Sequence, residues 1–67
     1  MSDSIEIIKS ECSQLKERLE NLALLIECDD FEKIVTNSEE RGLIIMQYDA
    51  IRVYKRILNK RINILEK

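Results

Sequence analysis

The 67-residue sequence contains no histidine, no proline and no tryptophan, and its single glycine is Gly42. Without histidine there is no nucleophile–histidine pair of the hydrolase type and no imidazole ligand for a metal. One glycine is too few for the glycine-rich loop that cradles phosphates in nucleotide-binding enzymes. Cys12 and Cys28 lack Cys-x-x-Cys spacing, and Cys12 falls in an apolar stripe where a thiol is buried and inert. We therefore expect no catalysis, no metal and no cofactor.

Long hydrophobic runs are also missing. The longest apolar run, residues 22–26, is far shorter than the roughly 20 residues that a membrane-spanning helix needs. The N-terminal residues show no basic region followed by an apolar run, so we expect no secretory signal. We therefore expect a cytoplasmic protein whose two thiols stay reduced and that does not bind a membrane.

The short length predicts that the chain has a partner. Residues 1–67 make one domain, and a chain of this size buries only roughly 60% of the surface that its unfolded form exposes. Natural proteins of this size are usually stabilised by disulfides, a metal or another chain. Since neither a disulfide nor a metal is expected here, we expect that another chain stabilises this one.

The apolar pattern predicts two long helices. Between residues 5 and 26, apolar side chains recur at alternating steps of three and four, which is the heptad stripe that one helix packs against another. The stripe consists of Ile5, Ile8, Cys12, Leu15, Leu19, Leu22 and Ile26. A short helical connection is expected at residues 31–35, then a polar break at 36–38 with Ser38 as N-cap, then a helix from about Glu39 to Leu65. We predict an all-α fold, an antiparallel two-helix hairpin with a short helical connection.

In the second helix, one heptad position is apolar and the alternate position is polar. The apolar position holds Ile44, Ile51, Leu58 and Leu65, and the alternate one holds Gln47, Tyr54 and Arg61. One interpretation is structural, with Gln47 fixing the register, the Tyr54 ring packing, and Arg61 extending to water. The other is a polar pocket between helices, because an amide, a phenol and a guanidinium can hold a nucleobase or a phosphate. With the nearby cations, the candidate ligand-binding residues are Gln47, Arg52, Tyr54, Lys55 and Arg61, at an interface between protomers.

Further apolar residues lie outside both stripes. They are Leu24, Leu25, Ile45, Met46, Val53, Ile57 and Ile64. A two-helix hairpin has only one inner face, so these side chains would form an exposed apolar patch. We therefore predict a homo-oligomer, at least a dimer, assembled as a helical bundle.

Charge is distributed unevenly along the chain. Residues 1–40 carry eleven acids and four bases, whereas residues 52–67 carry six bases and the single acid Glu66. Helix dipoles and the pairing of opposite ends explain this pattern, and so does an anionic ligand attracted to the basic end. The eleven N-terminal carboxylates disfavour a long polyanion, so nucleic acid is not an expected partner. A small anion in a shielded pocket is less affected.

Residues 15–65 resemble a family of small helical-hairpin proteins of tailed phages, of the type found in crAss-like phages. The matching residues are Leu15-Lys16-Glu17-Arg18-Leu19, Phe31, Leu43-Ile44, Gln47, Ile51, Tyr54, Leu58 and Arg61-Ile62. Ile51 stands where the family usually has Met, and Ile44 where it has Leu. Gln47, Tyr54 and Arg61, spaced by sevens, are the specific part of the pattern.

The resemblance implies a phage setting and a binding function. Small oligomeric phage proteins of this kind include sponges that sequester nucleotide immune signals, and one such sponge for cyclic dinucleotides has a similar helical hairpin. Its N-terminal Gly-Tyr-Arg and downstream Asn-x-x-Lys signature is absent here. The resemblance implies an anti-defence protein that binds a cyclic oligonucleotide or a cyclic ADP-ribose type of signal without cleaving it, in the cytoplasm of an infected bacterium. The alternative is a phage accessory protein that binds a host or defence protein through a helical face.

Overall fold

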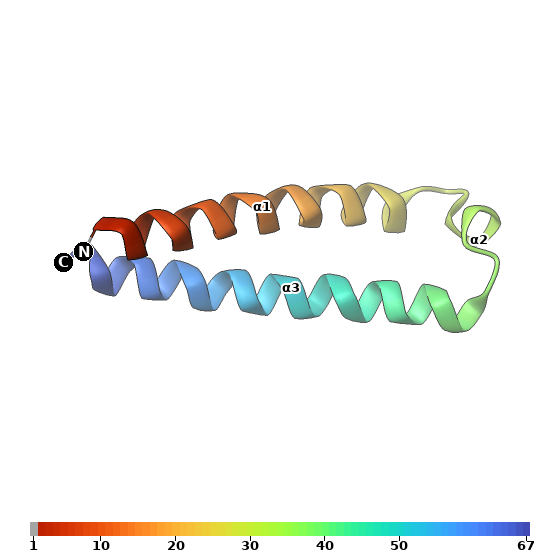
Figure 1. Cartoon of the computed structure of the whole chain (residues 1–67). Coiled ribbons are helices and arrows are strands. Elements are labelled where there is room, and N and C mark those ends of the chain that lie inside the picture. The colour runs from red at the N-terminus through yellow and green to blue at the C-terminus, as the bar shows by residue number, and fades with distance from the viewer. Residues whose placement is uncertain (1) are drawn as a thin grey trace.

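The protein consists of two long helices joined by a very short one. The computed structural model describes the backbone of residues 2–67 and the side chains of residues 4–67. The helices are α1 (Ser2–Glu27), α2 (Phe31–Ile34) and α3 (Ser38–Leu65). Figure 1 shows α1 and α3 side by side and running in opposite directions, with α2 at the far end from the two termini. The all-α prediction is confirmed, and no helix in the described part of the chain is long and apolar enough to cross a membrane.

The stripe predicted for the first helix is the face that α1 turns toward α3. All seven of its members are buried or half-buried: Ile5, Ile8, Cys12, Leu15, Leu19, Leu22 and Ile26. The helix forms because it has neither Gly nor Pro in its interior and places this apolar stripe at heptad spacing. The sequence prediction for this face is confirmed.

The stripe predicted for the second helix is wrong at every alternate position. The inner stripe of α3 is buried or half-buried and consists of Ile44, Tyr48, Ile51, Lys55, Leu58 and Ile62. Gln47, Tyr54 and Arg61 are exposed instead, and Leu65, predicted for the apolar position, is 45% exposed. From Ile44, a step of three reaches Gln47 and a step of four reaches Tyr48, and both lie near the same helix face. Packing against α1 selects the step of four, which brings Tyr48 and Ile62 inside.

The core is small and lies nearer to the termini than to α2. Leu58 of α3, only 1% exposed, packs against Ile8, Cys12 and Leu15 of α1. Ile51 and Ile62 pack against this cluster from either side along α3. Leu58 is thus the side chain whose removal leaves the largest unfilled space between the helices.

The predicted short helical connection is confirmed as α2, but the predicted N-cap of the helix that follows is wrong by one residue. Asn37, not Ser38, has the extended backbone of a cap, and its side-chain Oδ1 accepts a hydrogen bond of 2.9 Å from the Glu40 backbone N–H. This bond satisfies one of the free N–H groups in the first turn of α3. Ser38 becomes the first residue of the helix.

Arg41 ties the connection to α3. Its guanidinium Nη1 donates to the backbone carbonyls of Val35, at 2.7 Å, and Thr36, at 3.1 Å. These two carbonyl groups lie beyond the last residue of α2, where the helix provides no N–H donor for them. The Arg41 side chain donates to them instead. One arginine thus holds the path of the chain between α2 and α3.

Candidate functional site

The five predicted ligand-binding residues lie on two different edges of α3. Gln47, Tyr54 and Arg61 are spaced by sevens along one edge, which we call the tyrosine edge. Arg52 is two residues from Tyr54, which places it about 160° away around the helix axis. Lys55 lies within the inner stripe and is half-buried. Within one copy of the chain, the structure therefore does not bring the five residues together.

The tyrosine edge faces a carboxylate. The Tyr54 hydroxyl donates a hydrogen bond of 2.8 Å to Glu11 Oε2 on α1. This bond is the main cause that raises the pKa of Tyr54 above its ordinary value of 10.0, while the charge of Arg61 lowers it. The phenol is therefore already engaged, and a phosphate placed beside it would meet the charge of Glu11.

Gln47 lines a small hollow farther along the same edge. The hollow has a volume of about 240 Å³ and is lined by Arg18, Asn21, Leu22, Gln47 and Ile51. Its polar groups are two amides and one guanidinium, and its floor is apolar. This hollow can hold a small polar group, but Arg18 is the one cation among its lining residues.

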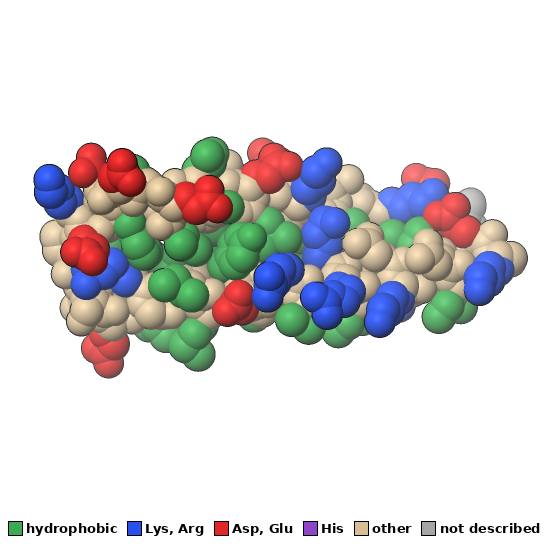
Figure 2. All heavy atoms as spheres, turned by 180° about the vertical axis from the view of Figure 1, so that it is seen from behind, with side chains coloured by type: hydrophobic (Ala, Val, Ile, Leu, Met, Phe, Trp, Pro, Cys, Tyr) green, Lys and Arg blue, Asp and Glu red, His purple; other side chains and the backbone are tan. Residues whose placement is uncertain are grey.

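Arg52 and Lys55 meet α1 at the opposite edge, in a hollow that we call the basic hollow. Its volume is about 400 Å³, and its lining residues are Lys16, Leu19, Glu20, Arg52, Lys55, Arg56 and Asn59. Four of these are cations and one is an acid, so the lining carries a formal charge of +3 (4 − 1). Figure 2 shows Lys and Arg side chains gathered over α3 and between the two helices. In the basic hollow, two of the predicted site residues come together with one cation of the other helix, Lys16.

The cations of the basic hollow are weakly paired. Arg52 Nη2 lies 3.7 Å from Asp49 Oδ1, which is long for a charge-assisted hydrogen bond. Among the residues that the structure describes, no ion pair involves Lys16, Lys55 or Arg56. Their charges are consequently available to an anion.

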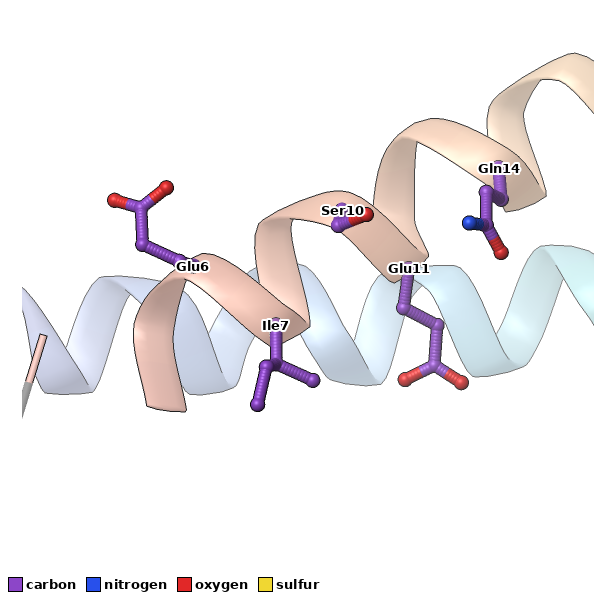
Figure 3. Close-up of a pocket in the computed structure, with 5 residues that line it drawn as sticks. All are labelled: Glu6, Ile7, Ser10, Glu11 and Gln14. Carbon is purple, nitrogen blue, oxygen red and sulfur yellow. The ribbon is translucent and has the colours of Figure 1, made fainter. Parts of the chain in front are cut away.

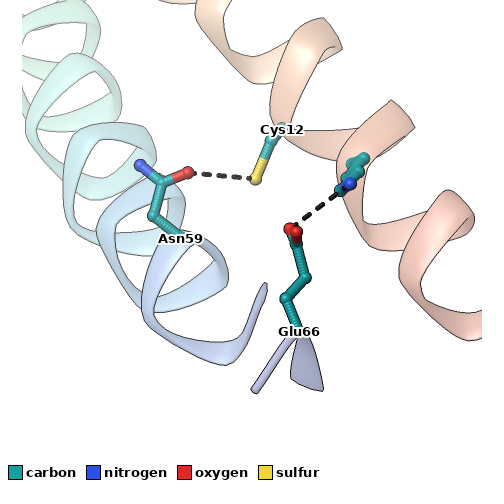
Figure 4. Close-up of polar contacts among 4 residues, drawn as sticks. Cys12, Asn59 and Glu66 are labelled. Carbon is teal, nitrogen blue, oxygen red and sulfur yellow. Dashed lines mark hydrogen bonds and ion pairs between the residues drawn. The ribbon is translucent and has the colours of Figure 1, made fainter. Parts of the chain in front are cut away.

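Asn59 connects the basic hollow to the core. The Cys12 thiol donates to Asn59 Oδ1 over 3.6 Å, and the amide nitrogen of Asn59 points away from Cys12 (Figure 4). Close by, Lys9 Nζ and Glu66 Oε1 form an ion pair at 3.3 Å between the two terminal ends of the helices. The Cys12 contact fixes the Asn59 side chain and leaves its two amide hydrogens for another acceptor.

A third hollow lies on α1 alone. It has a volume of about 490 Å³ and is lined by Glu6, Ile7, Ser10, Glu11 and Gln14 (Figure 3). It presents two carboxylates and no cation, so it is unsuited to an anion. Across the described residues, no group of three or more acidic or cysteine side chains is placed to hold a metal ion.

Lys16, Arg56 and Asn59 were not predicted from the sequence as members of a possible site. Lys16 follows Leu15 of the α1 stripe directly, so its side chain borders the contact with α3. That position is a signal that could have been read from the heptad pattern. Its pairing with Arg52 and Lys55 depends on how the two helices align, which no local pattern specifies.

Comparison with known protein families yields a match over almost the whole described chain. A family model described as Sequestin matches residues 2–64. The matched range includes α1, α2 and all of α3 except its final residue. No curated protein and no solved structure matches the chain. The family match therefore covers every residue of the basic hollow.

Proposed function

The chain belongs to the Sequestin family, and we propose that it is a binding protein that sequesters a small anionic signal without cleaving it. The family name points to sequestration. The proposed ligand is a nucleotide immune signal of the cyclic oligonucleotide or cyclic ADP-ribose type. The proposed setting is phage anti-defence, in the cytoplasm of an infected bacterium.

The observation that carries this proposal is the convergence of four cations from two helices on one hollow. Lys16 comes from α1, and Arg52, Lys55 and Arg56 come from α3. A guanidinium binds phosphate oxygens through two parallel N–H donors, and an ammonium adds a point charge. A nucleotide signal carries both phosphates and polar base edges, and the amide of Asn59 can serve the latter.

The size of the basic hollow also fits a small molecule. Ligand sites in proteins usually have volumes of about 300–1,000 Å³, and the basic hollow has about 400 Å³. Leu19 supplies apolar surface for a ring, and the four cations line the same hollow. The overall negative charge of the protein repels a long nucleic acid, whereas a small anion at the basic hollow meets mainly its four cations.

The proposed binding form is a homo-oligomer of at least two copies. Among the hydrophobic side chains of one copy, Leu43, Met46 and Ile64 are 60%, 65% and 69% exposed. A second copy that covers them would stabilise a chain whose buried core, within the described residues, consists of four side chains. Sequestration needs only binding and slow release, so no catalytic group is required.

A ligand screen on the purified full chain tests the proposal. The panel consists of cyclic dinucleotides, cyclic trinucleotides and cyclic ADP-ribose isomers, each read by thermal unfolding and by calorimetry. At a concentration one hundred times its Kd, a ligand raises the free energy of unfolding by about 2.7 kcal/mol. Recovery of the ligand unchanged after heat denaturation shows sequestration without cleavage.

Matched variants locate the ligand. Arg52→Gln and Lys16→Gln should each weaken binding by about tenfold or more, because each removes a charge-assisted contact. Lys33→Gln removes the same charge from α2 and should bind normally. Loss of binding in Arg61→Gln and Tyr54→Phe, with Arg52→Gln unaffected, would move the ligand to the tyrosine edge. Absence of any ligand effect across the panel would overturn the proposal.

A second candidate function is binding of a host or defence protein through a helical face. The observation that favours it is the exposed apolar surface of α3, which includes Val53 and Ile57 at 48% and 50% exposure. Such a surface suits a helix-in-groove contact. Stoichiometric co-purification of one host protein, together with no response in the ligand screen, would favour this function.

A further inference from the structure

A second heptad stripe runs along the outer side of α3. From residue 43 to residue 64, seven positions recur at steps of three and four: Leu43, Met46, Ala50, Val53, Ile57, Lys60 and Ile64. All but Lys60 are apolar. The inner stripe of α3 follows the same rhythm but is displaced by about half a turn around the axis. We call this second series the outer stripe.

The outer stripe is uncovered in a single copy. Its five large apolar side chains are between 48% and 69% exposed: Leu43, Met46, Val53, Ile57 and Ile64. Figure 2 shows hydrophobic side chains along the side of α3 that faces away from α1. A helix with apolar stripes on two opposite faces packs between two other helices, because each stripe excludes water only against a partner. In this chain α1 covers the inner stripe alone.

We infer that a second copy of the chain covers the outer stripe, α3 against α3, with the two helices antiparallel. This inference rests on the proposed homo-oligomer and specifies its interface. The stripe from Leu43 to Ile64 is about 32 Å long at 1.5 Å per residue. Full overlap of two such stripes places the two-fold axis near residues 53 and 54, the midpoint of the stripe.

A copy of the same helix is the complement that the chain itself offers. A heptad stripe packs best against another heptad stripe, through knobs-into-holes contacts. Along the outer side of α1, the corresponding positions are Ile7, Ser10, Gln14, Glu17, Asn21 and Leu24, so the four central ones are polar and apolar residues stand only at the two ends. The outer stripe of α3 is therefore the exposed heptad surface available in the described chain. Contact between the same surface on two copies gives a closed two-fold dimer.

Charge selects the antiparallel orientation. Residues 39–49 of α3 carry the acids Glu39, Glu40 and Asp49 and one base, Arg41. Residues 52–61 carry five bases and no acid. With residue 43 beside residue 64, antiparallel packing places Asp49 within one turn of Lys60 and Arg61 of the other copy and Glu40 beside Lys67, whereas parallel packing places each acid beside its own counterpart. Lys60 interrupts the stripe within the basic half, where its stem can lie along the apolar surface and its charge can reach the acidic half.

The geometry gives a distance test. With a two-fold axis near residue 53, that residue lies next to its own counterpart in the other copy. Measured along the helix axis, Leu43 and Ile64 are each about 32 Å from their own counterparts. Leu43 instead lies beside Ile64 of the second copy. Parallel packing would instead place every stripe residue next to its own counterpart.

Cysteine crosslinking of the full chain measures this arrangement. In a Cys28→Ser background, which removes the exposed native thiol, single cysteines are introduced as Val53→Cys, Leu43→Cys and Ile64→Cys and treated with a short bismaleimide. Ser13→Cys, at an exposed position of α1, is the matched control. Helical circular dichroism confirms that each variant folds.

We expect rapid dimer crosslinking of Val53→Cys alone, and of Leu43→Cys mixed with Ile64→Cys after refolding together. Leu43→Cys alone, Ile64→Cys alone and Ser13→Cys should crosslink at least tenfold more slowly. Equal crosslinking of each stripe variant with itself would indicate parallel packing and overturn the inference. A monomer in light scattering, or a dimer without crosslinks at the stripe, would also overturn it. The readout involves no ligand, so its failure is distinct from a negative ligand screen.

Discussion

The Tyr54 hydroxyl on α3 donates a hydrogen bond of 2.8 Å to Glu11 Oε2 on α1, joining residues 43 positions apart in the chain. The bond crosses the contact between the two long helices at the tyrosine edge. It places a negative charge beside a residue that was predicted from the sequence to bind the ligand. The relationship therefore affects both the titration of Tyr54 and the choice of ligand site.

The pKa of Tyr54 should lie above 10.0 and should depend on Glu11. The hydrogen bond favours the neutral phenol, which raises the pKa. Because the folded-state pKa is raised, the bond stabilises the fold below pH 10.0, and this contribution is lost as the pH rises through the folded-state pKa. Ultraviolet titration of a Tyr48→Phe variant reports Tyr54 alone. Adding Glu11→Gln should shift the titration down toward 10.0.

Glu17→Gln is the control for that titration. Glu17 is an exposed acid on the same helix and does not contact Tyr54 among the hydrogen bonds found in the described residues. Its replacement should leave the Tyr54 titration unchanged. Equal shifts in Glu11→Gln and Glu17→Gln would show that general charge, and not the hydrogen bond, sets the pKa.

Asn37→Ala should destabilise the fold by about 1 kcal/mol, because the helix loses its side-chain cap. The bond that disappears is the one from the Glu40 backbone N–H to Asn37 Oδ1. Ser38→Ala, one residue later, should change stability by only a few tenths of a kcal/mol, because Ser38 is already inside the helix. Urea unfolding followed by circular dichroism measures both. A larger loss of stability in Ser38→Ala than in Asn37→Ala would instead identify Ser38 as the N-cap.

Leu58→Ala should destabilise the protein by about 2–5 kcal/mol, since it removes the most deeply buried side chain and leaves a cavity. A domain of this length has only about 3–10 kcal/mol of stability, so the variant should lose much of its helical content at room temperature. Leu24→Ala makes the same chemical change at a position that is 72% exposed. Its thermal midpoint should stay within a few degrees of the parent protein, and a comparable loss would contradict the assignment of the core.

The helices could be predicted from the sequence because their signals are local. The absence of proline, the apolar steps in residues 5–26 and the polar break before residue 39 predict where helices begin and end, to within three residues at the start of α1 and one residue at its end and at the ends of α3. The inner face of α1 was predicted completely, because seven consecutive heptad positions are apolar and no neighbouring stripe competes. Local periodicity was sufficient there.

In α3 the sequence is compatible with two possible stripes. Apolar residues surround much of this helix, so a step of four from Ile44 to Tyr48 is as compatible with the sequence as the predicted step of three from Ile44 to Gln47. The two positions differ by about 100° around the helix axis, and both border the face that Ile44 occupies. Contact with α1 decided that Tyr48 faces inward and Gln47 outward.

The sequence by itself determined that this chain is helical, how long its helices are, and that more apolar surface exists than one copy can bury. Only the tertiary structure decided which cations share a hollow. Lys16 and Arg52 are 36 residues apart, and their meeting depends on the alignment of α1 with α3. It also separated Arg52 from Tyr54 and Arg61, because residues two apart on a helix point to nearly opposite sides. Backbone preferences act over a few residues, whereas a binding site depends on contacts between distant ones.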